Sequence, residues 1–175
     1  MKQEFEFSIR QMRPEDAAAA AEIEQRSFSE PWSEQGFLEA LNNPNTWCIK
    51  VVPAEMYPAD NERSRQPEGS EEGHVLHRLL VGYCILYLAA NEAEIAVIAV
   101  AGSYRGRGIA DAMLTYVKEQ MPARGIRRIL LDVRPSNLAA RALYEKHGFL
   151  MDGLRKNFYR DPKEDAVLMS FDTDQ

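Results

Sequence analysis

The chain has few cysteines, no long apolar run and no excess of positive charge, and each absence excludes a class of protein. Its two cysteines, Cys48 and Cys84, lie in apolar segments, so they are predicted to be buried, reduced thiols of a cytoplasmic protein, with a bridge between them as the alternative. No run approaches the ~18 apolar residues of a membrane helix, and the first residues, MKQEFE, do not form a signal peptide. The net charge of -6 is unlike that of a general nucleic-acid binder. We therefore expect neither a membrane nor a nucleic acid as partner.

Internal repeats are also absent, and 175 residues is the length of a single domain, which we expect over 1–175. One segment, Pro53 to Arg78, differs from the rest because it is rich in charge and proline and poor in apolar residues. It is predicted to be a mobile loop or an extended hairpin connection. His74 and His77, beside Glu71 and Glu72, suggest a metal site, but their spacing is not that of a known ligand set. A solvated loop without metal is the expectation.

The most informative stretch is Glu94 to Lys118, EIAVIAVAGSYRGRGIADAMLTYVK. It begins with an apolar run, Ile95 to Val100, which is the pattern of a buried strand. It ends with apolar residues at helical spacing, so the strand leads through a glycine-containing turn into a helix. The first turn of a helix has free N–H groups and a positive dipole end. Because Gly106 and Gly108 let an anion approach the backbone, the turn is a candidate phosphate site.

The turn does not fit two familiar phosphate motifs. No Gly-Lys-Ser/Thr follows, so it is not a P-loop, and the dinucleotide fingerprint fails at Asp111. Arg105 to Ala110, RGRGIA, instead resembles Q/R-x-x-G-x-G/A, the pyrophosphate loop of the GNAT acyl-coenzyme A N-acyltransferases. Leu131 to Asn137 and Ala142 to Phe149 resemble the fifth strand and fourth helix of that family. The resemblance covers nearly the whole chain except Pro53 to Arg78.

The sequence pattern by itself predicts a mixed α/β or α+β protein with helices covering a sheet. Strands are expected at 5–12, 46–52, 79–88, 95–100, 127–133, 149–151 and 166–171, and helices at 13–24, 34–41, 109–117 and 135–148. The family resemblance adds the topology, a mixed central sheet of about seven strands flanked by about four helices. In that topology the fourth and fifth strands splay apart and hold the cofactor, so acetyl-CoA is the implied cosubstrate, with no metal.

The resemblance also assigns cofactor contacts. The turn would meet the pyrophosphate, the fourth strand would pair with the pantetheine amides, and an N–H of Ile98 or Val100 would polarise the acetyl carbonyl, a contribution of ~3 kcal/mol for one such donor. Asn137, at a helix start, would contact the cofactor or serve as an N-cap. The predicted cofactor-binding residues are Ile98, Ala99, Val100, Arg105, Gly106, Arg107, Gly108, Ile109, Ala110 and Asn137.

Two residues are predicted to be catalytic. Asp132 is an acid in an otherwise apolar strand, where a carboxylate needs a partner or a function. The resemblance makes it the general base, directly or through a water, and the alternative is a carboxylate that orders the strand end or pairs with Arg134. Tyr144, in Ala-Leu-Tyr-Glu, matches the family's proton donor to the coenzyme A thiolate. A phenol with a pKa of ~10 suits that role, and a buried structural tyrosine is the alternative.

The acceptor is suggested by a closer resemblance to the bacterial ribosomal-protein-alanine N-acetyltransferases, the RimI type. It rests on Ile23 to Arg26 followed by Pro31-Trp-Ser33, on Leu154 to Tyr159, and on Glu164 to Met169. In that type the segment before the second helix and the loop between the last two strands border the acceptor. Trp32 and Tyr159 are therefore predicted to contact the substrate, with a core tryptophan and an exposed hairpin tyrosine as the alternatives.

We accordingly expect an N-acetyltransferase that transfers acetyl directly, in a ternary complex, to the α-amine of a protein N-terminus. The implied acceptor is the N-terminal alanine of a small-subunit ribosomal protein. An α-amine with a pKa of ~8 is roughly a tenth neutral at pH 7, whereas a lysine is neutral about once in 2,500 molecules. A single aspartate base suits the α-amine better. An acetyltransferase for small amines and a non-catalytic acyl-coenzyme A sensor remain as alternatives, and the oligomeric state is not indicated.

Overall fold

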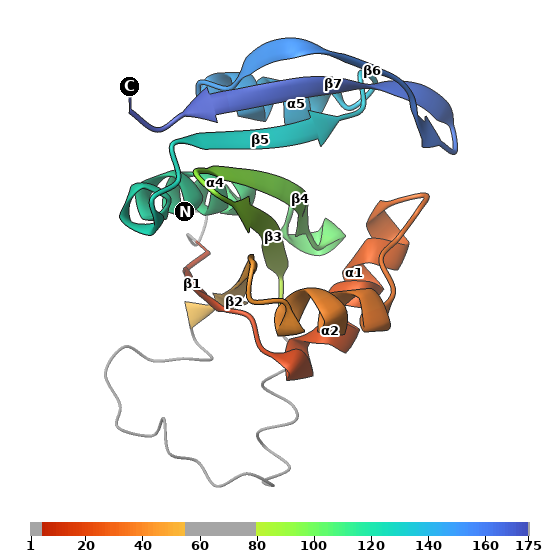
Figure 1. The fold of residues 1–175 in the computed structure, drawn as a ribbon. Helices are drawn as coiled ribbons and strands as arrows, with labels where there is room; N and C mark the ends of the chain where they lie inside the picture. Colours follow the sequence, from red (N-terminus) through yellow and green to blue (C-terminus); the bar gives the residue numbers. More distant parts are fainter. Residues whose placement is uncertain (1–4, 55–79, 175) are drawn as a thin grey trace, which may run out of the picture.

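The computed structural model describes residues 5–54 and 80–174, which form a seven-stranded sheet with helices on both faces (Figure 1). The strand order is β1-β2-β3-β4-β5-β7-β6, and every neighbouring pair is antiparallel except β4 with β5. The strands are β1 Phe7–Gln11, β2 Thr46–Pro53, β3 Gly82–Ala89, β4 Glu92–Val100, β5 Arg128–Val133, β6 Leu150–Arg160 and β7 Lys163–Asp172. The α-helices are α1 Ala17–Ser27, α2 Glu34–Asn42, α4 Ile109–Gln120 and α5 Leu138–Lys146, with short 3-10 turns η1 Pro14–Asp16, η3 Gly102–Tyr104 and η4 Pro122–Arg124.

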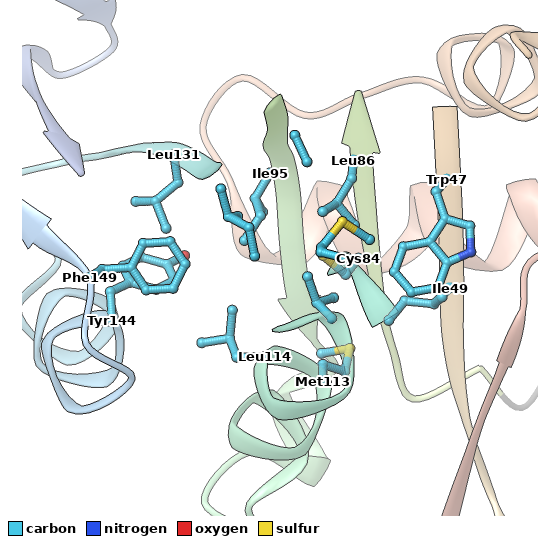
Figure 2. Close-up of a cluster of buried hydrophobic side chains, with 14 of the residues drawn as sticks. Trp47, Ile49, Cys84, Leu86, Ile95, Met113, Leu114, Leu131, Tyr144 and Phe149 are labelled. Atoms are coloured by element: carbon cyan, nitrogen blue, oxygen red, sulfur yellow. The ribbon is translucent and has the colours of Figure 1, made fainter. Parts of the chain in front are cut away.

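Two apolar clusters lie on opposite faces of the sheet. Helices α1 and α2 cover one face of β2, β3 and β4, where Phe37 packs edge-on against Tyr83 with ring centroids 5.2 Å apart. Helices α4 and α5 lie on the other face, and Figure 2 shows Met113 and Leu114 of α4 in that cluster. The sheet alternates between the two cores because successive strand residues point to opposite faces. Cys48 belongs to the first core and Cys84 to the second, and both are free and buried, as predicted; no bridge joins them.

The helix boundaries follow local chemistry that the sequence predicts. Ser33 accepts a hydrogen bond from the Gly36 N–H at 3.2 Å and so caps α2. Asn137 caps α5 in the same way, through the Ala140 N–H at 3.2 Å. Gly148 follows α5 with a φ of +83°, the left-handed conformation typical of a helix end. The mixed sheet and its four described α-helices confirm the predicted fold class.

The expectation of a loop over the segment Leu154 to Tyr159 is wrong, because β6 continues to Arg160. Most of β6 is exposed, since it is the edge strand of the sheet, and its pairing with β7 shifts register at two places. An exposed, bulged edge strand has no apolar alternation, so the sequence gives no strand signal there. The predicted insertion, Pro53 to Arg78, lies almost wholly outside the described residues, together with His74 and His77; Pro53 itself ends β2.

The parallel pair β4 and β5 separates partway along its length, which confirms the predicted splay (Figure 1). The ladder runs from Glu92 opposite Arg128 to Ile95 opposite Leu131 and stops there. The next residue, Ala96, is an extra residue in the pairing of β4 with β3, a β-bulge. A bulge bends a strand and increases its twist. The bulge therefore lies where β4 turns away from β5.

Candidate functional site

The far half of β4 has one unpaired edge, which is the first part of the candidate site. Ala101 N–H donates to Val81 O at 2.9 Å, so alternate residues before it, including Ala99, direct their backbone groups toward β3. Ile98 and Val100 then direct theirs toward the side of β5, where pairing has ended. This matches the edge predicted to carry the pantetheine and the acetyl carbonyl. The Ala99 side chain packs in the core beneath α1 and α2.

The turn before α4 is the second part. Gly106 and Gly108 have φ values of +73° and +77°, a backbone conformation that L side chains rarely adopt. A Cβ added at either glycine would meet no atom within 4 Å, so the space beside the turn is open. Gly108 is the N-cap of α4 and provides no side-chain cap, which leaves the first N–H groups of the helix, including those of Ile109 and Ala110, directed outward. The turn thus fits a phosphate ligand such as the pyrophosphate of coenzyme A.

The two arginines of the turn are anchored on the protein. The Arg105 guanidinium donates from Nε to Val100 O at 3.1 Å and from Nη2 to Ser27 Oγ at 3.0 Å. The Arg107 guanidinium lies 5.2 Å from the ring centroid of Phe5 and 5.3 Å from that of Tyr104. Both charges therefore stay beside the turn, but Arg105 also ties the end of β4 to the last turn of α1. The sequence motif gave no sign of that second contact.

Asp132 lies near the carboxyl end of β5, on the face opposite the α5 core, and its side chain is 16% exposed. Its carboxylate accepts a hydrogen bond from Arg155 Nη1 at 2.8 Å. Burial raises the pKa of Asp132, and the Arg155 charge opposes that rise. The expected alternative partner, Arg134, is wrong: Arg134 instead pairs with Glu164 at 3.2 Å. The sequence could not indicate Arg155, because β6 was not predicted to extend that far.

The carboxylate of Asp132 borders a hollow of about 160 Å³ that Glu94, Asp152, Arg155 and Leu168 also line. This hollow lies at the base of the splay, since Glu94 belongs to the paired part of β4. A carboxylate with access to such a hollow can accept a proton from a group that enters it.

Tyr144 lies on α5 and is 6% exposed, inside the core on the α4 side of the sheet. Figure 2 shows it with Phe149 next to Leu131, facing the strands of the other half of the sheet; the Tyr144 and Phe149 ring centroids are 5.8 Å apart. Burial raises the pKa of Tyr144, and Cys84 and Tyr159 add to the rise. The phenol is therefore protonated at neutral pH and able to donate. Asn137 serves as the N-cap of α5 and is exposed.

The predicted acceptor residues lie on two different segments. Trp32 packs against Phe37 and Tyr87, with ring centroids 5.5 and 6.4 Å away, and borders a hollow of about 320 Å³ beside α2. Tyr159 lies near the tip of the β6–β7 hairpin, with the Arg134 guanidinium 4.1 Å from its ring centroid. Burial and the neighbouring Asp132 raise the pKa of Tyr159 to about 12. Trp32 lines that hollow and Tyr159 does not, but the two segments meet through Ser29 with Asp161 and Glu30 with Arg160.

Arg134 joins those two segments, a role that sequence reasoning missed. Its guanidinium donates to Asp161 O at 2.9 Å and Pro162 O at 2.8 Å in the hairpin turn, and to Ser29 Oγ at 3.3 Å in the segment between α1 and α2. Ser29 Oγ also bonds Asp161 O. The arginine next to Pro135 was the only available signal, and it does not specify these partners.

Comparison with known proteins agrees with this geometry. Residues 17–149 match the acetyltransferase (GNAT) family, and the chain belongs to that family. It is an N-acetyltransferase, and its cosubstrate is acetyl-CoA. Within the part of the chain that the structure describes, no helix is long and apolar enough to cross a membrane, and no group of His, Cys, Asp and Glu side chains could hold a metal ion.

Similarity to individual proteins is more specific than the match to the family. A Bacillus subtilis (strain 168) protein with the provisional name [ribosomal protein bS18]-alanine N-acetyltransferase is 32% identical over 93% of each chain. The crystal structure of the ribosomal-protein-S18-alanine N-acetyltransferase from Escherichia coli has a TM-score of 0.75 and 28% identity, covering 96% of this chain and 94% of that one. Arabidopsis thaliana NAA60, solved in complex with acetyl-CoA, shares the fold with a TM-score of 0.76 at 20% identity, covering 97% of this chain and 100% of the other.

Proposed function

We propose that this enzyme acetylates the α-amino group of a protein N-terminus, and that its acceptor is the N-terminal alanine of ribosomal protein bS18. The observation that carries the proposal is the similarity to the two alanine N-acetyltransferases, which covers more than nine-tenths of every chain compared. A match of that extent spans the acceptor-side segments as well as the cofactor turn. The acceptor is therefore a protein, with the hairpin and the segment between α1 and α2 as its borders.

The residues take the following roles in the proposed reaction. Ile98, Ala99 and Val100 provide the strand edge for the pantetheine, and an N–H of Ile98 or Val100 polarises the acetyl carbonyl. The turn from Arg105 to Ala110, with Asn137, holds the remainder of coenzyme A through backbone N–H groups at the start of α4. When bound, acetyl-CoA supplies the activated acetyl group.

Proton transfers are assigned to Asp132 and Tyr144. The Asp132 carboxylate takes a proton from the acceptor amine, directly or through a water, as the amine attacks the carbonyl. The Tyr144 hydroxyl gives a proton to the departing thiolate; burial raises the pKa of the phenol and so keeps that proton in place until the thiolate forms. Trp32 and Tyr159 border the acceptor. We also place the enzyme in the cytoplasm, where the thiols of Cys48 and Cys84 would stay reduced.

The test is acetyl transfer from acetyl-CoA followed by thiol release, with two peptides. One peptide has the bS18 N-terminal sequence and begins with an unblocked alanine; the other is N-terminally blocked and carries an internal lysine. Turnover of the first peptide alone is expected, because its amine is partly neutral at pH 7. Turnover of the blocked peptide, or of small amines such as spermidine in place of either peptide, would overturn the proposal. A protein that binds acetyl-CoA and acetylates nothing would be the sensor alternative.

A further inference from the structure

Glu24, in the last turns of α1, is a buried carboxylate that the proposed reaction does not use. It is 1% exposed and lies among the apolar residues beneath α1 and α2. Burying a carboxylate is costly unless its oxygens are bonded, and no ion pair with Glu24 occurs within residues 5–54 and 80–174. Burial accordingly raises its pKa. Apolar packing alone therefore does not explain a glutamate at this position.

Both carboxylate oxygens of Glu24 are bonded, and the two donors belong to different parts of the molecule. Oε1 accepts from the Tyr83 hydroxyl, which is fully buried on β3. Oε2 accepts from the Trp32 backbone N–H at 3.0 Å. Glu24 therefore connects a central strand to the segment between α1 and α2, through side chain and backbone respectively.

Tyr83 contacts the strand next to the cosubstrate edge, and Trp32 belongs to the segment on the acceptor side. Tyr83 is opposite Ala99 in the pairing of β3 with β4, so it supports the strand between Ile98 and Val100, whose backbone groups form the open edge. Trp32 belongs to the segment that reaches the hairpin through Glu30, which accepts from the Arg160 N–H at 3.4 Å. The same turn of α1 is tied to the end of β4 by the hydrogen bond of Arg105 to Ser27.

We propose that Glu24 is a positioning residue for acetyl transfer: by holding Tyr83 and the Trp32 backbone together, it fixes the distance between the acceptor border and the strand edge that carries the acetyl group. This inference rests on the proposed function, because it takes the segment at Trp32 as an acceptor border. Small misplacements of reacting groups are expensive, with ~100-fold in rate for about 1 Å. A rigid link between the two borders would prevent them.

Glu24→Gln tests the inference with almost no change in size. The glutamine amide has an NH2 donor in place of one of the two carboxylate oxygens, so it cannot accept at both of the positions that face Tyr83 and Trp32. We expect KM for the acceptor peptide to rise ~10-fold while KM for acetyl-CoA changes less than ~2-fold. Tyr83→Phe removes one partner only and should give a smaller rise, and adding it to Glu24→Gln should add little, since the two residues act as one unit. Glu22→Gln, an exposed neighbour on the same helix, is the matched control and should leave both constants unchanged.

A second readout does not depend on the acceptor. In a Trp47→Phe background, where Trp32 is the sole tryptophan, acrylamide quenching of its fluorescence reports how firmly the segment is held. Glu24→Gln should raise the quenching constant and Glu22→Gln should not. An unchanged acceptor KM with unchanged quenching, or an equal rise in both KM values, would overturn the role of Glu24. Absence of turnover by the wild-type enzyme with the alanine peptide would instead count against the proposed function, and the quenching result would still decide for or against Glu24.

Discussion

The two halves of the sheet differ in how they are covered. Strands β2 to β4 have α1 and α2 on one face and α4 on the other, and Tyr83 at their centre is 0% exposed. Strands β5, β7 and β6 have α5 against one face, and the edge strand leaves Met151 56% and Leu154 51% exposed. The covered half provides backbone groups, which lie at the edge of β4 and in the turn before α4. The open half provides Asp132 and Tyr144. In the proposed mechanism, the covered half thus binds the cosubstrate and the open half transfers the protons.

Asp132→Asn should produce the largest effect if proton transfer belongs to the open half. Loss of a general base typically costs ~10²–10⁴-fold in rate, so we expect a fall of that size in kcat with an unchanged dissociation constant for acetyl-CoA by calorimetry. Raising the pH should recover part of the activity, because more of the acceptor amine is then neutral. Asp152→Asn, in the same hollow, is the control. A normal kcat for Asp132→Asn would show that the carboxylate only pairs with Arg155.

Tyr144→Phe should come next, with kcat lower by ~10²-fold, near the small end for general-acid catalysis. The ring packing against Phe149 is retained, so the melting temperature should change little. Because the pKa of Tyr144 is raised above its usual value near 10, the wild-type enzyme should show no loss of kcat from this group up to pH ~10. An alkaline loss of kcat that persists in Tyr144→Phe would have to come from a different group. Equal kcat in both enzymes would remove Tyr144 from the mechanism.

Gly108→Ala examines the covered half. In the free protein the new Cβ has open space, and the positive φ costs ~1–2 kcal/mol of stability. If coenzyme A phosphates fill that space, KM for acetyl-CoA should rise ~10-fold, equivalent to one lost charge-assisted contact, with kcat at saturation largely kept. Gly125→Ala is matched, since Gly125 also has a positive φ and open space but lies beyond the other end of α4. The same rise in both variants would mean strain and not a ligand site.

Arg155→Met should give the smallest effect, a shift in the pKa of Asp132. The Arg155 charge lowers the pKa of Asp132 against the effect of burial, so its removal should move that pKa further upward. Carbon-13 NMR of the carboxyl group measures the midpoint directly, and kcat near pH 7 should fall less than in Asp132→Asn. A midpoint that stays in place or moves downward would mean that the contact at 2.8 Å is not maintained in solution.

The same division explains what the sequence could predict. In the covered half, apolar runs such as Ile95 to Val100 and caps such as Ser33 specify elements locally, and the predicted strands and helices are confirmed there. The splay was predicted from family resemblance, since no periodicity encodes it. In the open half, only the start of β6 was predicted, at 149–151, because the exposed residues that follow carry no burial pattern.

For the site residues, the sequence indicated residue types and their order along the chain, but not which side chains they contact in the fold. Asp132 stood out as an acid in an apolar strand, yet its cation, Arg155, lies in the part of β6 that the sequence did not predict. Glu24 did not stand out, because a glutamate in a helix is ordinary until its burial is known. Roles that depend on three-dimensional neighbours, such as that of Arg134 at the hairpin, require the structure.

The extra residue in β4 has a wider consequence. Backbone N–H and C=O groups must be bonded to something, and a sheet normally bonds them to its own next strand. Without Ala96 the ladder that ends at Ile95 and Leu131 would be free to continue, and Ile98 would come opposite Val133. The backbone groups of β4 would then be bonded within the sheet, and none would remain to bond a substrate amide. A single small residue that makes one strand longer than its partner thus leaves backbone groups of β4 without a neighbouring strand, and in the proposed mechanism the pantetheine of acetyl-CoA takes that strand's place.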